Sequence, residues 1–197
     1  MLILASTSPY RRELLGRLGL PFECRSPGVD ETALPGEAPL ALAIRLARAK
    51  AQAVLTQSPD AVVIGSDQVA LCEGRVLGKP GTPDKAIEQL QWQRGRVTEF
   101  HTAFAVLRGS QSVEEVVTTR VVWRSARELS DERLANYVAL ERPFDCAGAA
   151  KSEGLGIALL SQVESTDPTA LIGLPLIRVC QALSDLGMEL LPRPSAA

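Results

Sequence analysis

The sequence predicts an α/β fold in which a mixed sheet is flanked by helices. Helical and strand-like segments alternate early in the chain, and strand-like stretches near 98–107 and 113–124 then follow each other as a pair. With 197 residues, 46% of them hydrophobic, the chain can build a sizeable core. This length fits one domain over 1–197, with a tail from about residue 190, or one domain with a cleft between two lobes.

The first element is a short hydrophobic strand that ends at Ala5 and runs into Ser6-Thr7-Ser8. Ser8 is a typical N-cap and Pro9 a typical first helical residue, because proline has no N–H to leave unpaired. Leucines then recur at helical spacing until Gly19. The helix start therefore combines free backbone N–H groups, the hydroxyls of Ser6 and Ser8, and Arg11, with Arg12 beside it. This predicts an anion site, although a well-capped helix with two solvated arginines would have the same pattern.

The next elements are a short strand at 22–25, a loop over 27–39 rich in proline and glycine, and an alanine- and leucine-rich helix at 40–57. Asp30 and Glu31 are expected to be exposed in that loop. A buried strand at 61–64 is expected to end in Gly65-Ser66-Asp67-Gln68. A hairpin then pairs 69–72 with 75–77 and closes at Gly78-Lys79-Pro80.

The second half of the chain begins with a helix from Pro83, capped by Thr82, to Gly95. The two long strands follow, and Ser130 caps a helix that continues through Val138. The segment from Cys146 to Gly156 is rich in glycine and alanine. A strand at 157–163, a last helix at 174–186 and the tail LPRPSAA complete the prediction.

Composition excludes several classes of protein. The net charge is −2, with 21 basic and 23 acidic residues interspersed, which argues against a nucleic-acid or membrane-surface binder. No segment approaches the ~20 apolar residues of a membrane span, and the start lacks a secretory pattern, so we expect a cytoplasmic protein. The four cysteines are widely spaced, and His101, the only histidine, lies in a strand-like stretch. A zinc site or a histidine-based nucleophile is therefore not favoured.

Three polar residues stand out from their surroundings. Lys50 lies in the middle of the apolar face of helix 40–57, so it must either snorkel to water or meet an anion. Asp67 follows a strand that is expected to be buried on both faces, and ligand sites of α/β sheets gather at such strand ends, although aspartate is also common in turns. Lys79 lies between a glycine and a proline, where a lysine is usually solvated.

Together, these residues suggest phosphate chemistry. Arg11, Lys50 and Lys79 supply positive charge for phosphate oxygens, while Glu31 and Asp67 supply oxygen ligands for a hard divalent cation. Such a cation would bridge to the same phosphates, as phosphoryl chemistry on a triphosphate requires.

The sequence resembles the Maf family of nucleotide pyrophosphatases over nearly its whole length. The matching motifs are Ser6-Thr7-Ser8-Pro9, Val29-Asp30-Glu31, Arg45-Leu46-Ala47-Arg48-Ala49-Lys50-Ala51, Gly65-Ser66-Asp67, Gly78-Lys79-Pro80, Ala147-Gly148 and Gly173-Leu174-Pro175-Leu176. The resemblance implies a fold similar to that of inosine triphosphate pyrophosphatases, with the active site in a cleft between two lobes. It further implies cleavage of a nucleoside triphosphate between the α and β phosphates, in the cytoplasm, by an enzyme that is often a homodimer.

The same resemblance assigns roles to residues. Asp67 resembles the proton acceptor that activates water, and Glu31 and Asp67 would hold a divalent metal such as Mg²⁺, Mn²⁺ or Co²⁺. The triphosphate would be held by Ser6, Ser8, Arg11, Lys50 and Lys79, which places the two lysines in the catalytic site with Asp67. Arg12 has no clear role in the family.

The Maf family divides into branches that prefer different nucleotide bases. At the positions that differ between these branches, the chain has Tyr10, Gln68 and Glu153. Gly65-Ser66-Asp67-Gln68 and Lys151-Ser152-Glu153-Gly154 resemble the 7-methyl-GTP pyrophosphatase branch, where tryptophan can stand in place of Tyr10. We therefore expect an enzyme that clears 7-methyl-GTP. The alternatives are a pyrophosphatase for other standard or modified nucleotides and a nucleotide-binding regulator of septum formation and cell division.

Overall fold

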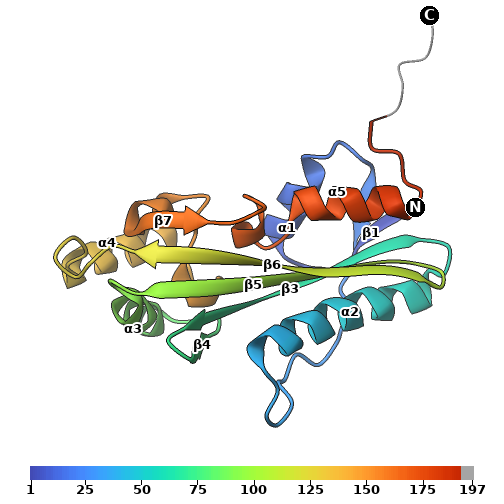
Figure 1. Ribbon diagram of the computed structural model, residues 1–197. Helices are drawn as coiled ribbons and strands as arrows, with labels where there is room; N and C mark the ends of the chain where they lie inside the picture. Colours follow the sequence, from blue (N-terminus) through green and yellow to red (C-terminus); the bar gives the residue numbers. More distant parts are fainter. Residues whose placement is uncertain (192–197) are drawn as a thin grey trace, which may run out of the picture.

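The backbone forms a seven-stranded mixed sheet with helices packed against it (Figure 1). The structure is a computed structural model and describes residues 1–191. Along the sheet the order is β2-β1-β3-β5-β6-β7, and β4 pairs with one end of β3. The strands are β1 (Leu2–Leu4), β2 (Phe22–Cys24), β3 (Val62–Cys72), β4 (Arg75–Leu77), β5 (Val97–Arg108), β6 (Gln111–Trp123) and β7 (Leu160–Glu164). β1 runs parallel to β2 and β3, whereas the other pairs are antiparallel, so the predicted mixed sheet is confirmed.

Each helix begins where the sequence places a cap or a proline. The helices are α1 (Pro9–Gly16), α2 (Pro39–Gln57), α3 (Pro83–Gln93), α4 (Asp131–Glu141) and α5 (Leu176–Asp185). Ser8, Thr82 and Ser130 each accept a hydrogen bond from the backbone N–H three residues later, as predicted for N-caps. Short 3₁₀ segments at Ala147–Ala149, Leu155–Leu159 and Ala170–Ile172 connect the later elements.

Opposite faces of the sheet pack against different helices. On one face, Val62 and Ile64 of β3 share a cluster with leucines of α1 and α5. On the other, Val63 packs with the apolar face of α2. This alternation follows from the two-residue period of a strand, and it fixes α2 on the opposite side of the sheet from α1 and α5.

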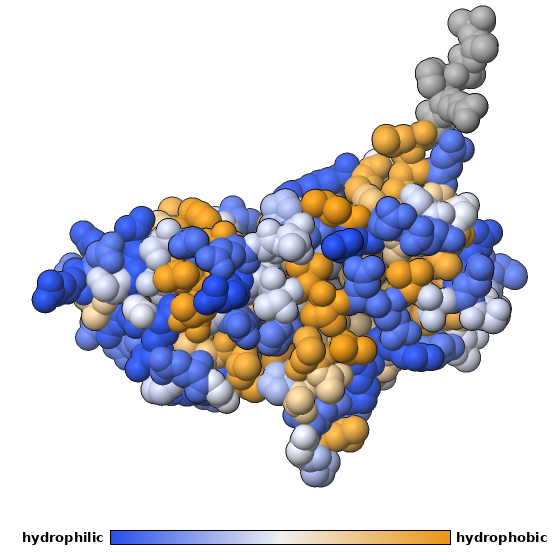
Figure 2. Space-filling view, in the orientation of Figure 1, coloured by the Kyte–Doolittle hydropathy of each residue, from blue (hydrophilic) through white to orange (hydrophobic). Residues whose placement is uncertain are grey.

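The long strands β3, β5 and β6 join two separately packed regions. Near the start of β3 the core contains β1, α1, α2 and α5, and near its end a second cluster contains α3, α4 and β7. In Figure 1 these groups of helices lie toward opposite ends of the long strands. Hydrophobic residues reach the surface in patches separated by hydrophilic ones (Figure 2), and the exposed side chains Leu34, Leu40 and Ile44 lie in and just before the start of α2.

Two predicted strand boundaries are wrong. β3 does not end before Asp67: it continues to Cys72, and Asp67 pairs with Ala103 of β5 in its middle. Gly65 belongs to the strand, where it pairs with Ala105 of β5, and the backbone of α2 lies directly against it. The expected strand at 157–163 begins only at Leu160, because Leu155–Leu159 form a 3₁₀ turn in which the Ile157 N–H donates to Gly154 O.

The last helix starts at Leu176, two residues later than predicted, and residues 192–197 of the expected tail lie outside the described residues. Among the described helices, none is both long and apolar enough to cross a membrane.

Candidate active site

The middle of β3 has an open edge. Along one side of this strand, β1 pairs with Val62–Ile64 and β4 pairs with Ala70–Cys72. Residues 65–69 between them pair only with β5, on the other side, among the strands that the structure describes. The loop after β1 and the turn after β4 flank this opening, so side chains from both can meet Asp67.

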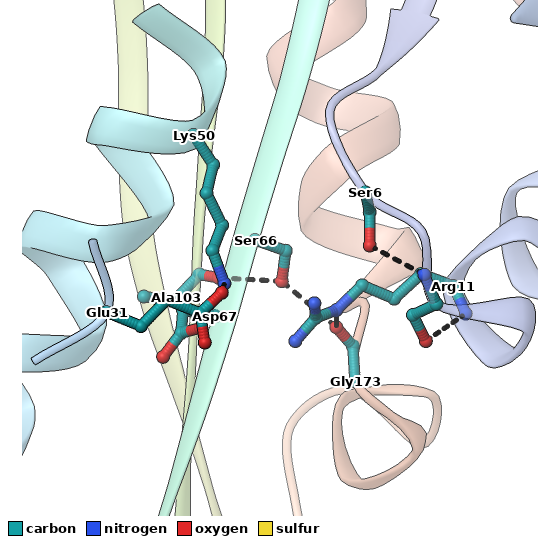
Figure 3. Close-up of polar contacts among 9 residues, drawn as sticks. Ser6, Arg11, Glu31, Lys50, Ser66, Asp67, Ala103 and Gly173 are labelled. Atoms are coloured by element: carbon teal, nitrogen blue, oxygen red, sulfur yellow. Dashed lines mark hydrogen bonds and ion pairs between the residues drawn. The ribbon is translucent and has the colours of Figure 1, made fainter. Parts of the chain in front are cut away.

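Lys50 reaches this opening from α2 (Figure 3). Its Nζ lies 2.7 Å from Asp67 Oδ1 and 2.6 Å from Glu31 Oε1, and the Lys50 and Asp67 side chains are only 6% and 11% exposed. Of the two alternatives for this lysine, the structure therefore shows an anion partner rather than snorkelling. Gly65 makes the approach possible, because a Cβ there would lie 2.2 Å from Ala47 O of α2.

Arg11 is held from the opposite side by a glycine carbonyl. Its Nε donates to Gly173 O at 2.9 Å, and the Ser66 hydroxyl lies 3.0 Å from the same oxygen (Figure 3). The pKa of Arg11 is lowered because burial disfavours its charged form, an effect that Asp67 and Glu31 oppose. A half-buried guanidinium in the field of two carboxylates can also bind a strongly anionic ligand in the cavity that it lines.

Most of the backbone donors that the sequence leaves free at the start of α1 are used by its caps, and Pro9 has no N–H. Ser6 Oγ accepts from Ser8 N–H at 3.1 Å, and Ser8 Oγ accepts from Arg11 N–H at 3.4 Å. The predicted cap is thus confirmed, and the positive end of the helix faces the same cavity as the Arg11 side chain.

A cavity of about 500 Å³ brings most of the predicted site residues together. Its lining includes Ser8, Tyr10, Arg11, Glu31, Lys50, Asp67, Gln68, Lys79 and Glu153. Ser6 instead lines an adjoining cavity of about 240 Å³, which shares Ser8, Arg11, Glu31, Lys50 and Lys79 with the first. Arg12 and His101 line neither of these two cavities, and the His101 ring lies 3.0 Å from the Thr118 hydroxyl.

Tyr10, Asp145, Cys146 and Glu153 line the large cavity but not the adjoining one, so they mark the end away from Arg11, Lys50 and Lys79, which both cavities share. The Tyr10 hydroxyl donates to Asp145 Oδ1 at 3.3 Å. Burial raises the pKa of Glu153, an effect that nearby Lys151 opposes and Glu141 reinforces. This end therefore combines an aromatic ring with two acidic side chains.

Gln68 has less freedom than the sequence suggests. Its Nε2 lies 2.9 Å from the Thr102 hydroxyl and 3.1 and 3.0 Å from the carbonyls of Ala170 and Leu171. An amide NH₂ has only two hydrogens, so these contacts use both. Gln68 can offer a ligand in the cavity only its carbonyl oxygen.

Glu31 and Asp67 are the residues at this site that could hold a metal ion. Burial raises the pKa of Glu31, but the hydrogen bond from Lys50 and the charges of Lys50, Lys79 and Arg11 lower it on balance, so Glu31 is a carboxylate at neutral pH. Both carboxylates contact one Nζ atom, so their oxygens are close enough to share a cation. Two hard oxygen donors suit Mg²⁺ or Mn²⁺ when a ligand and water complete the shell, and within residues 1–191 no group of three or more potential metal ligands gathers.

Sequence reasoning missed Asp145 and Cys146 and used Gly173 only as part of a motif. Asp145 lies 135 positions from Tyr10, in a segment whose only sequence signal was its small residues. Gly173 has φ +123°, a conformation that favours glycine, but its carbonyl partners Arg11 and Ser66 are far away in the chain.

Comparison with known proteins gives a consistent result. A family model described as Maf-like protein matches residues 1–186. A protein named 7-methyl-GTP pyrophosphatase from Polaromonas sp. (strain JS666) is 55% identical over 191 residues, which cover 96% of this chain and 86% of that one. Proteins with the same name from Cupriavidus pinatubonensis (55% identical, 94% of this chain and 93% of that one) and Aromatoleum aromaticum (56%, 96% and 97%) are similarly close.

Proposed function

The chain belongs to the Maf-like protein family, and from this membership and its site we propose that it is a nucleoside triphosphate pyrophosphatase that hydrolyses 7-methyl-GTP to 7-methyl-GMP and pyrophosphate. The names of its relatives support the activity. The predicted likeness to inosine triphosphate pyrophosphatases, the homodimer and the cytoplasmic location stay predictions.

The observation that carries the proposal is the charge polarity of the cavity. Arg11, Lys50, Lys79 and the start of α1 gather at one end, where Glu31 and Asp67 only partly offset them. Asp145 and Glu153 lie with Tyr10 at the other end, which the adjoining cavity does not share. 7-Methyl-GTP has the complementary polarity, since its triphosphate is anionic and methylation at N7 makes its purine cationic. Electrostatic complementarity of this kind favours the methylated nucleotide over GTP.

At the basic end, the proposed roles follow from position. The lysines and Arg11 would bind phosphate oxygens, and the positive end of the α1 dipole would favour the same anionic group. Asp67 would accept the proton of the attacking water while the α–β anhydride bond breaks and pyrophosphate leaves. Lys50, which donates a hydrogen bond to Asp67, would orient this carboxylate.

We further propose that a divalent cation binds with the nucleotide, held by Glu31 and Asp67 on the protein side. A bound cation would neutralise phosphate charge and polarise the oxygens on the reacting phosphorus. Without a cation, two carboxylates facing a triphosphate would repel it. Mg²⁺, Mn²⁺ and Co²⁺ are the candidates.

The proposal is tested with a panel of nucleoside triphosphates, standard and methylated, by measuring pyrophosphate release. The expected result is the highest kcat/KM for 7-methyl-GTP, with a requirement for divalent metal that a chelator abolishes. A higher kcat/KM for another nucleotide would favour the alternative substrate. Binding without any pyrophosphate release would favour the regulator of cell division instead.

Asp67→Asn is the matched variant for the chemical step. Asparagine keeps the shape and can still accept from Lys50, but it is a far weaker base. We expect nucleotide binding to persist and kcat to fall by about 10²–10⁴-fold. If the variant keeps full kcat and an unchanged circular dichroism spectrum, the general base lies elsewhere.

A further inference from the structure

Two segments from opposite parts of the chain meet at the acidic end of the cavity. Tyr10 lies in the first turn of α1, whereas Asp145 and Cys146 precede the Ala147–Ala149 turn. Asp145 Oδ1 lies 3.3 Å from the Tyr10 hydroxyl and 3.5 Å from Cys146 Sγ. One carboxylate oxygen therefore contacts both neighbours.

The neighbours of Asp145 are neutral donors. Burial, with smaller contributions from Cys146 and Asp145, raises the pKa of the Tyr10 hydroxyl, so it stays protonated. Burial and the charge of Asp145 raise the pKa of the Cys146 thiol to about 12. Within residues 1–191 Asp145 takes part in no ion pair, so its charge is not cancelled by direct contact with a cation.

The Tyr10 ring already attracts one cation of the chain. Lys151 Nζ lies 5.9 Å from the ring centroid and also donates to Glu141 O at 2.8 Å. The face of the Tyr10 ring therefore attracts a positive charge, a cationic base would take the place of the Lys151 ammonium on it, and the Tyr10 hydroxyl donates to Asp145. A delocalised cation stacked on the ring would gain from both the ring and the carboxylate.

We propose that Asp145 is a specificity-determining residue for positively charged purines: it holds the Tyr10 ring in place and provides the negative charge beside it. This inference rests on the proposed function, because it assumes that the base of the nucleotide lies at this end of the cavity. A neutral purine would use the ring but gain little from the carboxylate. Asp145 therefore raises the preference for 7-methylguanine over guanine.

Asp145→Asn separates charge from position, because the asparagine carbonyl can still accept from Tyr10. We expect the ratio of kcat/KM for 7-methyl-GTP to that for GTP to fall by about 3- to 30-fold. Asp145→Glu, which restores the charge, should recover most of the ratio.

Tyr10→Phe keeps the charge but frees the ring, so it should raise KM for both nucleotides and leave the ratio within about twofold. Asp60→Asn, an exposed turn residue outside the cavity, is the control for overall charge.

Binding of the monophosphates gives a readout that does not depend on turnover. In the unmodified protein the preference for 7-methyl-GMP over GMP should weaken as salt is raised, because charge attraction is screened. In Asp145→Asn the preference should be smaller and should depend less on salt, because only the charge of Glu153 then remains at this end of the cavity. A merely structural role of Asp145 would change both affinities equally and would leave the salt dependence in place.

The outcomes separate the two proposals. If the protein does not cleave 7-methyl-GTP but binds 7-methyl-GMP in an Asp145-dependent way, the function is wrong and the inference stands. If it cleaves 7-methyl-GTP and Asp145→Asn keeps the full preference, the inference is wrong and the function stands. Equal binding of both monophosphates by the unmodified protein also overturns the inference.

Discussion

At the scale of single residues, the buried ammonium of Lys50 is the centre of the site. It balances the charges of Asp67 and Glu31, which would otherwise face each other at the open edge of β3. Its aliphatic stem packs within the apolar face of α2, beside Ala47 and Val54. The same side chain thus contributes to the stability of the fold and to the charge of the basic end of the cavity.

Lys50→Met should damage both properties. Methionine fits the apolar face, but it leaves the buried Asp67 without its cation, at a cost of about 3 kcal/mol in the free energy of unfolding. KM for the triphosphate should rise as well. Urea unfolding and steady-state kinetics measure the two effects, with Lys85→Met, an exposed lysine of α3, as the control. An unchanged stability and KM would show that the lysine is dispensable.

The acidic end should respond to pH before the basic end does. The pKa of Glu153 is raised above its ordinary value of 4.5, whereas that of Glu31 is lowered below it. A protonated Glu153 is neutral and no longer attracts a cationic base. As pH falls, the preference for 7-methyl-GMP over GMP should therefore decrease while Glu31 is still charged.

The measurement is the ratio of the two dissociation constants as pH is lowered from 7 to 4.5, the ordinary value above which the pKa of Glu153 lies, with Glu153→Gln reporting changes that come from the nucleotides themselves. Glu153→Gln should show a lower ratio at neutral pH and a flatter profile. If the preference of the unmodified protein does not change with pH and matches that of Glu153→Gln, Glu153 takes no part in base selection.

At the scale of elements, the contact between α2 and β3 determines the geometry of the site. A Cβ at Gly65 would lie 2.2 Å from Ala47 O and 2.6 Å from Ala51 N, both backbone atoms of α2. Neither atom can move without moving the helix. Gly65 is therefore required for the short distance between Lys50 and Asp67.

Gly65→Ala should displace α2 and lengthen this ion pair. We expect a loss of about 1–3 kcal/mol in the free energy of unfolding, as for other overpacked cores, together with a lower kcat. Gly16→Ala is the matched control, because a Cβ at the end of α1 meets nothing within 4 Å. Equal effects of the two substitutions would contradict the packing argument.

Helix starts and the Lys50 anomaly could be predicted because their causes are local. Ser8, Thr82 and Ser130 cap helices by contacts three residues away, and helical periodicity alone places Lys50 among apolar residues. The predicted end of the strand before Asp67 was wrong because its cause is not local. Whether the strand continues past Gly65 depends on its pairing with β5, which is distant in the sequence, and no short segment of sequence encodes that pairing.

At the scale of the whole molecule, the cavity lies between the two packed regions that β3, β5 and β6 join. Tyr10 and Arg11 come from the first region, and Asp145 and Glu153 from segments next to the second. The pairing of Tyr10 with Asp145 was missed because it depends on this overall arrangement. A ligand that fills the cavity would contact both regions at once.

Such a ligand should stabilise the molecule against heat. The suitable probe is 7-methyl-GTP with a methylene group in place of the α–β bridging oxygen, since it cannot be cleaved there. At a concentration 100 times its Kd it should add about 2.7 kcal/mol, which corresponds to roughly 5–10 °C in Tm for a chain of this size. The corresponding GTP analogue should add less at the same concentration, because its base is neutral.

The metal dependence of this shift tests how the basic end works. Mg²⁺ alone should change Tm little, because the Lys50 ammonium already lies between Glu31 and Asp67. Mg²⁺ with the analogue should give the full shift, since the phosphates attract Lys50 and also supply ligands for the cation. A chelator should remove most of this increase in Tm. If the shift is equally large with the chelator, the carboxylates do not need a cation to accept a triphosphate, and the proposed metal site is wrong.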